Sequence, residues 1–214
     1  MKLGCSWSGG KDSCYALMKA LSDEHELMAL VNMMNENGKI SRSHGLPLSV
    51  LQQQAASIQV PLHVQPTSWN EYQQHFVETL LKIRQHHNVE AMVFGDIDLQ
   101  EHRDWEEMVC QKAGISALLP LWKQDRRKLV MEMLDAGIES MIVSCNTAMG
   151  EKFLGRMITR DLVAELESIE VDVCGENGEF HTVVINCPLF SKEIVLPSYK
   201  AILHDSYWFL HWEL

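Results

Sequence analysis

A short glycine-containing segment near the N-terminus carries the side chains whose types and spacing most directly suggest chemistry. The hexapeptide SGGKDS begins at Ser8 and ends at Ser13, between an apolar run and an amphipathic stretch. Gly9 and Gly10 let the backbone turn sharply and approach an anion, and N–H groups at the start of the next helix point toward that anion. Lys11 adds a positive charge, and the two serines add hydroxyl donors. The hexapeptide predicts a phosphate-binding loop, with a spacing too short for GxxxxGK[ST].

Two further polar segments are candidates for ligand binding. Gly95 and Asp96 follow an apolar run, and ligands of open α/β sheets lie beyond the carboxyl ends of the strands. An ordinary turn is the alternative at these two residues. The segment GENGEFHT ends at Thr182 and contains two carboxylates, Glu176 and Glu179, which is more than a polar turn needs. A polar hairpin alone is the alternative there.

The elements that must position these residues alternate regularly over the first 122 residues. Short apolar runs predict strands, and amphipathic stretches between them predict helices. We expect strands at 2–7, 27–34, 62–65, 91–94 and 117–119, and helices at 12–22, 47–58, 69–86 and 101–113. Strands that are apolar nearly throughout and alternate with helices indicate an α/β class with a parallel sheet covered on both faces.

The pattern changes after Trp122. We expect helices at 125–136 and 154–167, strands at 141–145, 171–174, 181–186 and 192–196, and an aromatic tail at 207–212. This mixture predicts a smaller C-terminal α+β lobe. We therefore expect a nucleotide-binding domain at 1–124 and a substrate-binding lobe at 125–214, with the functional site in the cleft between them.

Composition excludes several classes of protein. The 214 residues have a formal net charge of −11, with 46% hydrophobic and 22% charged residues, which is typical of a globular chain. An acidic protein lacks the basic face that nucleic-acid phosphates require, which argues against a nucleic-acid partner. The basic stretch from Lys123 to Lys128 is better explained as the solvated first turn of a helix.

The cysteines and the apolar runs bear on the compartment. None of the six cysteines forms a C-x-x-C pair, which favours reduced thiols and a cytoplasmic location. The apolar runs are far shorter than a membrane span, so we expect no membrane partner. We also expect no signal peptide, because the first apolar run leads directly into the glycine loop.

Several motifs in order resemble one family. SGGKDS is similar to the loop of the ATP pyrophosphatases, the PP-loop group with the adenine nucleotide α-hydrolase-like (HUP) fold. GDI after Phe94, HRDW from His102, LW from Leu121 and the segment CGENGEFHT from Cys174 resemble the diphthine–ammonia ligase family; SHG at 43–45 is a weaker match. The resemblance covers most of the chain, although eukaryotic members carry additional C-terminal domains.

The resemblance implies a reaction. ATP and Mg²⁺ would be used to adenylate a carboxylate substrate, with release of pyrophosphate, and ammonia or an amine would then displace AMP to form an amide. In the family this substrate leads to diphthamide, a modified histidine of elongation factor 2. A small-molecule carboxylate is the alternative substrate, and a homodimer is the family-level expectation for the assembly.

The resemblance also implies roles for residues of the N-terminal half. The hexapeptide would bind the phosphates of ATP, with Lys11 stabilising charge on the leaving pyrophosphate. Asp12 would help to hold Mg²⁺, or is an acid favoured by the helix dipole. Gly95 would admit adenine or ribose, Asp96 would bind substrate or metal, and Arg103 would pair with a phosphate or carboxylate unless it is simply solvated.

Roles for the remaining residues concern the substrate and the amine. Glu176 and Glu179 would bind an ammonium ion or take its proton, because only neutral ammonia is nucleophilic. Thr182 would hydrogen-bond the same substrate. His44 is a further substrate-binding candidate, although a lone loop histidine is more often solvated.

Two other functions are compatible with the motifs. A PP-loop tRNA-modifying enzyme of the thiolation type usually needs paired catalytic cysteines, which the spacing does not provide. A non-catalytic ATP-binding sensor would leave the two glutamates of the second lobe without a role.

Overall fold

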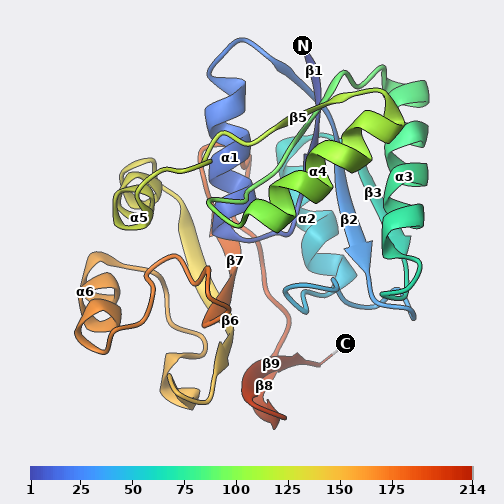
Figure 1. Ribbon diagram of the computed structural model, residues 1–214. Helices are drawn as coiled ribbons and strands as arrows, with labels where there is room; N and C mark the ends of the chain where they lie inside the picture. Colours follow the sequence, from blue (N-terminus) through green and yellow to red (C-terminus); the bar gives the residue numbers. More distant parts are fainter. Residues whose placement is uncertain (214) are drawn as a thin grey trace.

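The computed structural model describes residues 1–213 and shows a parallel sheet in the N-terminal half (Figure 1). Its elements are β1 (Lys2–Ser6), α1 (Lys11–Leu21), β2 (Glu26–Met34), α2 (Leu48–Ile58), β3 (Leu62–Pro66), α3 (Tyr72–His87), β4 (Ala91–Val93), α4 (Gln100–Ala113) and β5 (Ser116–Leu118). The strand order is β3-β2-β1-β4-β5, and every pair is parallel. The strands expected in this half are all present, which confirms the α/β class.

The two faces of this sheet are buried by different helices. Leu30 of β2 joins a core with residues of α1 and α2, whereas the neighbouring Ala29 and Val31 join a second core with residues of α3 and α4. This alternation follows from the two-residue repeat of a strand. β1 pairs with β2 on one side and β4 on the other, so the chain reverses its direction of strand addition at β1. Ligands of open α/β sheets bind at such a switch point.

The C-terminal half forms a smaller α+β lobe, as expected. It contains α5 (Arg126–Asp135), β6 (Glu139–Asn146), a 3₁₀ turn η1 (Glu151–Phe153), α6 (Arg160–Ser168), β7 (Phe180–Asn186), β8 (Tyr199–His204) and β9 (Tyr207–Trp212). The four strands form an antiparallel sheet in the order β7-β6-β9-β8. Figure 1 shows β7 passing beside α1, which brings this lobe against the N-terminal one.

Two strands expected in this lobe are wrong, and one expected helix is present but begins later than predicted. The helix expected at 154–167 begins at Arg160, because Thr159 caps it by accepting a hydrogen bond from Leu162 N at 3.2 Å. Residues 171–174 form a turn, in which the Asp172 carboxylate accepts a hydrogen bond from Cys174 N at 3.2 Å. Residues 192–196 lie outside any strand, and the strand that was missed is β8.

One hydrophobic core crosses from lobe to lobe. It runs from Leu3 in β1 through α1 and α2 to Val184 in β7 and Trp212 in β9. Gln54 of α2 reinforces this junction, because its side-chain amide donates to Gly9 O at 3.1 Å and to Val184 O at 2.8 Å. Within residues 1–213, no helix combines the length and apolar character that a membrane crossing requires.

Candidate functional site

A cavity of about 560 Å³ lies where the carboxyl ends of β1 and β4 face the segment before β7. That volume is in the range of small-molecule and cofactor sites. The cavity is lined by many of the residues expected to have a function: Ser8, Lys11, Asp12, Ser13, His44, Gly95, Asp96, Glu176 and Thr182. Four other expected residues, Gly9, Gly10, Arg103 and Glu179, are outside this lining.

The glycine loop is shaped by contacts within the protein. Gly9 has φ of +84°, in the region that favours glycine, and its carbonyl accepts a hydrogen bond from Val184 N at 2.8 Å. A Cβ on Gly10 would lie 2.4 Å from His44 Cε1 and 3.0 Å from Thr182 O. The serine hydroxyls at the two ends of the loop are 3.0 Å apart. The loop therefore needs Gly9 for its backbone conformation and Gly10 for close packing against His44 and the second lobe, and α1 begins directly after them.

Lys11 is buried, with 3% of its surface exposed. Its Nζ donates to both carboxylate oxygens of Asp12, at 2.8 and 2.9 Å, and to Cys174 O at 2.5 Å. Burial alone would lower the pKa of Lys11, but the negative groups around it, with Asp12 first, outweigh burial and raise it. The ammonium is thus charged and held in place in the cavity.

Two carboxyl groups lie together at the cavity, Asp96 from the loop after β4 and Glu106 from α4. Burial, followed by hydrogen bonding with Asp96 and then by its charge, raises the pKa of Glu106 to about 11, so Glu106 keeps its proton at neutral pH. Burial opposes ionisation of Asp96, but hydrogen bonds with His102 and Glu106 prevail and lower its pKa. His102 Nδ1 lies 2.7 Å from Asp96 Oδ1. The cavity therefore contains one ionised carboxylate here, between a protonated acid and a histidine whose pKa this contact raises.

Gly95 is required by packing. A Cβ at this position would lie 2.7 Å from Ser13 N and 2.9 Å from Asp12 C, both of which are backbone atoms. The absent side chain lets the end of β4 approach the first turn of α1. Packing against α1 therefore explains why residue 95 is a glycine, and this explanation does not depend on adenine or ribose.

The two glutamates of the second lobe are in different places. Glu176 lines the cavity, and burial, followed by the charge of Asp12, raises its pKa to about 8. Glu179 instead accepts hydrogen bonds from Asn177 N at 3.0 Å, from the Asn177 side chain at 3.0 Å and from Asp172 N at 3.4 Å. Glu179 thus stabilises the turn that presents Glu176.

Thr182 and two histidines form the wall next to the loop. Thr182 Oγ1 accepts a hydrogen bond from Lys11 N at 3.1 Å, and Thr182 O lies 2.8 Å from His44 Nδ1. Because a carbonyl can only accept, His44 carries its proton on Nδ1. Burial lowers the pKa of His44 to about 4 and that of His181 to about 3. The two rings, with centroids 4.6 Å apart, are neutral at physiological pH.

Arg103 does not join the cavity. Its Nε donates to Glu107 at 2.7 Å, one turn further along α4, and its guanidinium lies over the ring of Trp122 at 5.0 Å from the centroid. Its contact with a phosphate or a substrate carboxylate, expected from the sequence, stays a prediction.

An aromatic wall that the sequence analysis did not identify also lines the cavity. It consists of Trp69, Tyr72, Phe76, Phe94 and Trp105, with neighbouring ring centroids 5.1 to 6.3 Å apart. Trp69 is 70% exposed, although it is a large aromatic side chain. These residues come from α3, α4 and adjoining segments. In a sequence, aromatic residues at a helical repeat cannot be distinguished from residues of an ordinary core.

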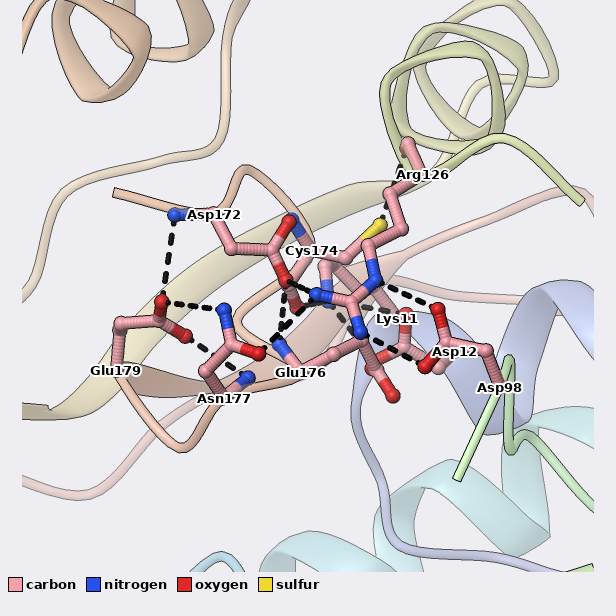
Figure 2. Close-up of polar contacts among 9 residues, drawn as sticks. All are labelled: Lys11, Asp12, Asp98, Arg126, Asp172, Cys174, Glu176, Asn177 and Glu179. Carbon is pink, nitrogen blue, oxygen red and sulfur yellow. Dashed lines mark hydrogen bonds and ion pairs between the residues drawn. The ribbon is translucent and has the colours of Figure 1, made fainter. Parts of the chain in front are cut away.

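A network of ionic contacts connects the lobes beside the cavity (Figure 2). Arg126, at the start of α5, donates from Nε and Nη2 to the two oxygens of Asp98 at 2.9 and 2.7 Å. Its Nη1 donates to Asp172 at 2.7 Å. This arginine belongs to the basic stretch that the sequence predicted to be solvated, so its two carboxylate partners correct that prediction.

The donors present fit a magnesium ion that is held mainly by a nucleotide. Within residues 1–213, no cluster of three or more His, Cys, Asp or Glu has the arrangement of a protein-only metal site. The carboxylates of Asp12, Asp96 and Glu176 lie in one cavity, and the charge of each of the other two raises the pKa of Glu176. Mg²⁺ prefers oxygen ligands and is usually bound through one or two carboxylates together with substrate phosphates.

Comparison with known proteins gives consistent matches over nearly the whole chain. Residues 1–117 match the family described as "Diphthamide synthase N-terminal domain", and residues 125–213 match "Diphthamide synthase C-terminal domain". A Schizosaccharomyces pombe protein named diphthine--ammonia ligase is 31% identical over 93% of this chain and 36% of its own length. The human protein of the same name is 27% identical over 96% of this chain and 86% of its own length.

A solved structure is also similar at a lower level. It is the predicted subunit of a tRNA methyltransferase from Methanocaldococcus jannaschii, with 13% identity and a TM-score of 0.44 over 91% of this chain and 100% of that one. A score of this size carries no argument about function. The chain spans about a third of the length of the S. pombe relative and most of the length of the human one.

Proposed function

We propose, because the chain belongs to the diphthamide synthase family, that it is an ATP-dependent diphthine–ammonia ligase. The observation that supports this most strongly is the cavity in which a buried, charged lysine and a glutamate with a raised pKa face each other. Lys11 comes from the glycine loop and Glu176 from the second lobe. The positive ammonium can stabilise the negative charge of a leaving pyrophosphate, and the carboxyl group can take a proton from an ammonium ion.

In the first step, the glycine loop binds the phosphates of ATP. A substrate carboxylate oxygen attacks the α-phosphorus, the bond from that phosphorus to the bridging oxygen breaks, and pyrophosphate leaves. Lys11 stabilises the charge that develops on pyrophosphate, together with the N–H groups at the start of α1. Mg²⁺ would be held by Asp12 and the phosphates, and would neutralise part of the same charge.

In the second step, ammonia attacks the acyl carbon of the adenylate, loses a proton, and displaces AMP. An ammonium ion is attracted to the carboxylates of the cavity, and only its neutral form is a nucleophile. Glu176, with a pKa of about 8, is well matched to take that proton near neutral pH. The aromatic wall borders the same space and would exclude water from the adenylate.

The remaining expectations about the protein's surroundings are part of the same proposal. All six cysteines are buried and free, which supports work in a reducing compartment such as the cytoplasm. We also retain the division into a nucleotide-binding domain at 1–124 and a substrate-binding lobe at 125–214, and a homodimeric assembly.

The test is a complete reaction with quantified products. The purified chain, ATP, magnesium, ¹⁵N-ammonium chloride and elongation factor 2 bearing diphthine should yield AMP, pyrophosphate and a ¹⁵N-labelled amide detected by mass spectrometry. Products of ADP and phosphate would contradict the mechanism. ATP bound without turnover would favour the sensor, and ATP-dependent sulfur incorporation into tRNA would favour the thiolation-type enzyme.

A further inference from the structure

Arg126 occupies a position where it contacts both lobes at the edge of the cavity. One side of its guanidinium holds both oxygens of Asp98, which lies in the loop after β4 of the N-terminal lobe. The other side donates to Asp172 at 2.7 Å, in the turn before β7 of the C-terminal lobe, and more weakly to Asn177 at 3.4 Å. Figure 2 shows the guanidinium between these partners.

Asp172 in turn holds the backbone of the segment that presents Glu176. Its carboxylate accepts hydrogen bonds from Cys174 N at 3.2 Å and from Glu176 N at 2.9 Å. Cys174 is fixed from two further directions, since its thiol donates to Arg126 O at 3.1 Å and its carbonyl accepts from Lys11 Nζ at 2.5 Å. The contacts form a continuous path from Arg126 through Asp172 to the backbone of Glu176.

We infer that Arg126 is a positioning residue, which ties the turn containing Asp172 to the loop containing Asp98 and so places the Glu176 carboxyl in the cavity opposite Lys11. The part of this inference that concerns ammonia transfer rests on the proposed function. The part that concerns the turn depends only on the contacts above.

The contacts of the neighbouring arginine show what is specific to Arg126. Arg127 has a side chain that is 60% exposed and makes one ion pair, to Glu167 at 2.7 Å. Exposed single pairs of this kind contribute little to stability. Arg126 is 26% exposed, makes a forked contact and reaches a second carboxylate, which the planar guanidinium allows and a lysine ammonium does not.

The first experiment separates the two half-reactions in Arg126→Ala, Arg126→Lys and the matched control Arg127→Ala. ATP–pyrophosphate exchange reports adenylation, and ¹⁵N incorporation reports ammonia transfer. We expect Arg126→Ala to lower transfer at least tenfold and exchange by less than about threefold, with an intermediate result for Arg126→Lys. Arg127→Ala should change neither. Equal losses in both half-reactions, or no loss, would overturn the positioning of Glu176.

The second experiment works without catalysis. Hydrogen exchange measured by NMR at the amides of Cys174 and Glu176 should accelerate in Arg126→Ala and remain at the wild-type rate in Arg127→Ala. Unchanged protection in Arg126→Ala would overturn the inference. If wild-type protein fails to amidate diphthine, the proposed function fails, and the exchange rates still decide whether Arg126 positions the turn.

Discussion

Replacing Gly95 with alanine tests how closely the end of β4 controls the glycine loop. The φ angle of Gly95 is not in the left-handed region, so alanine meets no backbone strain, and the cost comes from contact alone. The new Cβ would lie 2.7 Å from Ser13 N, whereas ordinary contact begins near 3.4 Å. The first turn of α1 must therefore move by roughly 0.7 Å relative to β4, because backbone atoms cannot rotate away as a side chain does.

Both stability and activity should respond to Gly95→Ala. Overpacking of this kind typically costs about 1–3 kcal/mol, which for a chain of this length lowers the melting temperature by about 2–4 °C per kcal/mol. A displacement near 1 Å in a catalytic arrangement costs up to about 100-fold in rate. We expect ATP–pyrophosphate exchange to fall 10- to 100-fold, measured below the melting temperature of the variant.

Gly4→Ala is the matched control. Its Cβ would meet Met92 Sδ at 2.7 Å and Ile83 Cδ1 at 3.0 Å, the movable ends of two side chains outside the cavity. This variant should lose stability and keep its exchange rate. The link between β4 and the glycine loop would be refuted if ATP–pyrophosphate exchange in Gly95→Ala stayed within about twofold of wild type while Gly4→Ala lost stability as expected.

Three further predictions concern charge and exposure. Lys11→Met should lower ATP–pyrophosphate exchange about 100- to 1,000-fold, as the loss of one preorganised electrostatic group does. Addition of an alkylamine should not restore exchange if the ion pair between Lys11 and Asp12 fixes the position of the ammonium. Native Glu106 keeps a proton that the unfolded chain releases near pH 4.5, so this group alone should lower the free energy of unfolding by about 1.4 kcal/mol per pH unit between pH 5 and 8. Urea titrations should therefore give Glu106→Gln a slope against pH that is more positive than the wild-type slope by about that amount, and equal slopes would contradict a protonated Glu106. Trp69→Ala should change the free energy of unfolding by less than about 0.5 kcal/mol, because the side chain is largely exposed. The KM for the acceptor protein should rise and the KM for ATP should not. A selective rise in the KM for ATP would instead place the nucleotide base on this tryptophan.

The N-terminal lobe could be predicted from the sequence because its signals are local. Each strand is a short apolar run, each helix has a clear repeat, and Gly114 ends α4 with φ of +69°. The glycine loop is recognisable for the same reason, since one hexapeptide supplies the turn, the charge and the helix start. The expected strands begin and end within about two residues of the observed ones.

The second lobe could not be predicted as well, because side-chain contacts decide its structure. The VDVC segment alternates like a strand, but the Asp172 carboxylate bonds the backbone ahead of it and forms a turn instead. In residues 192–196, Ile194 N makes one bond to Ile185 O, and no ladder follows. The role of Arg126 could not be predicted for a related reason, because its partners are 28 and 46 residues distant along the sequence.

The glycine loop is completed by residues that are synthesised much later than the loop itself. Lys11 N is bonded by Thr182, 171 residues further along the chain, and Gly9 O is bonded by Val184 N. On a ribosome, the first lobe emerges while these partners are still unmade, so its glycine loop and the surface it shares with β7 stay uncovered. The nascent chain therefore cannot make these contacts until β7 has been synthesised, and chains truncated before β7 lack them altogether.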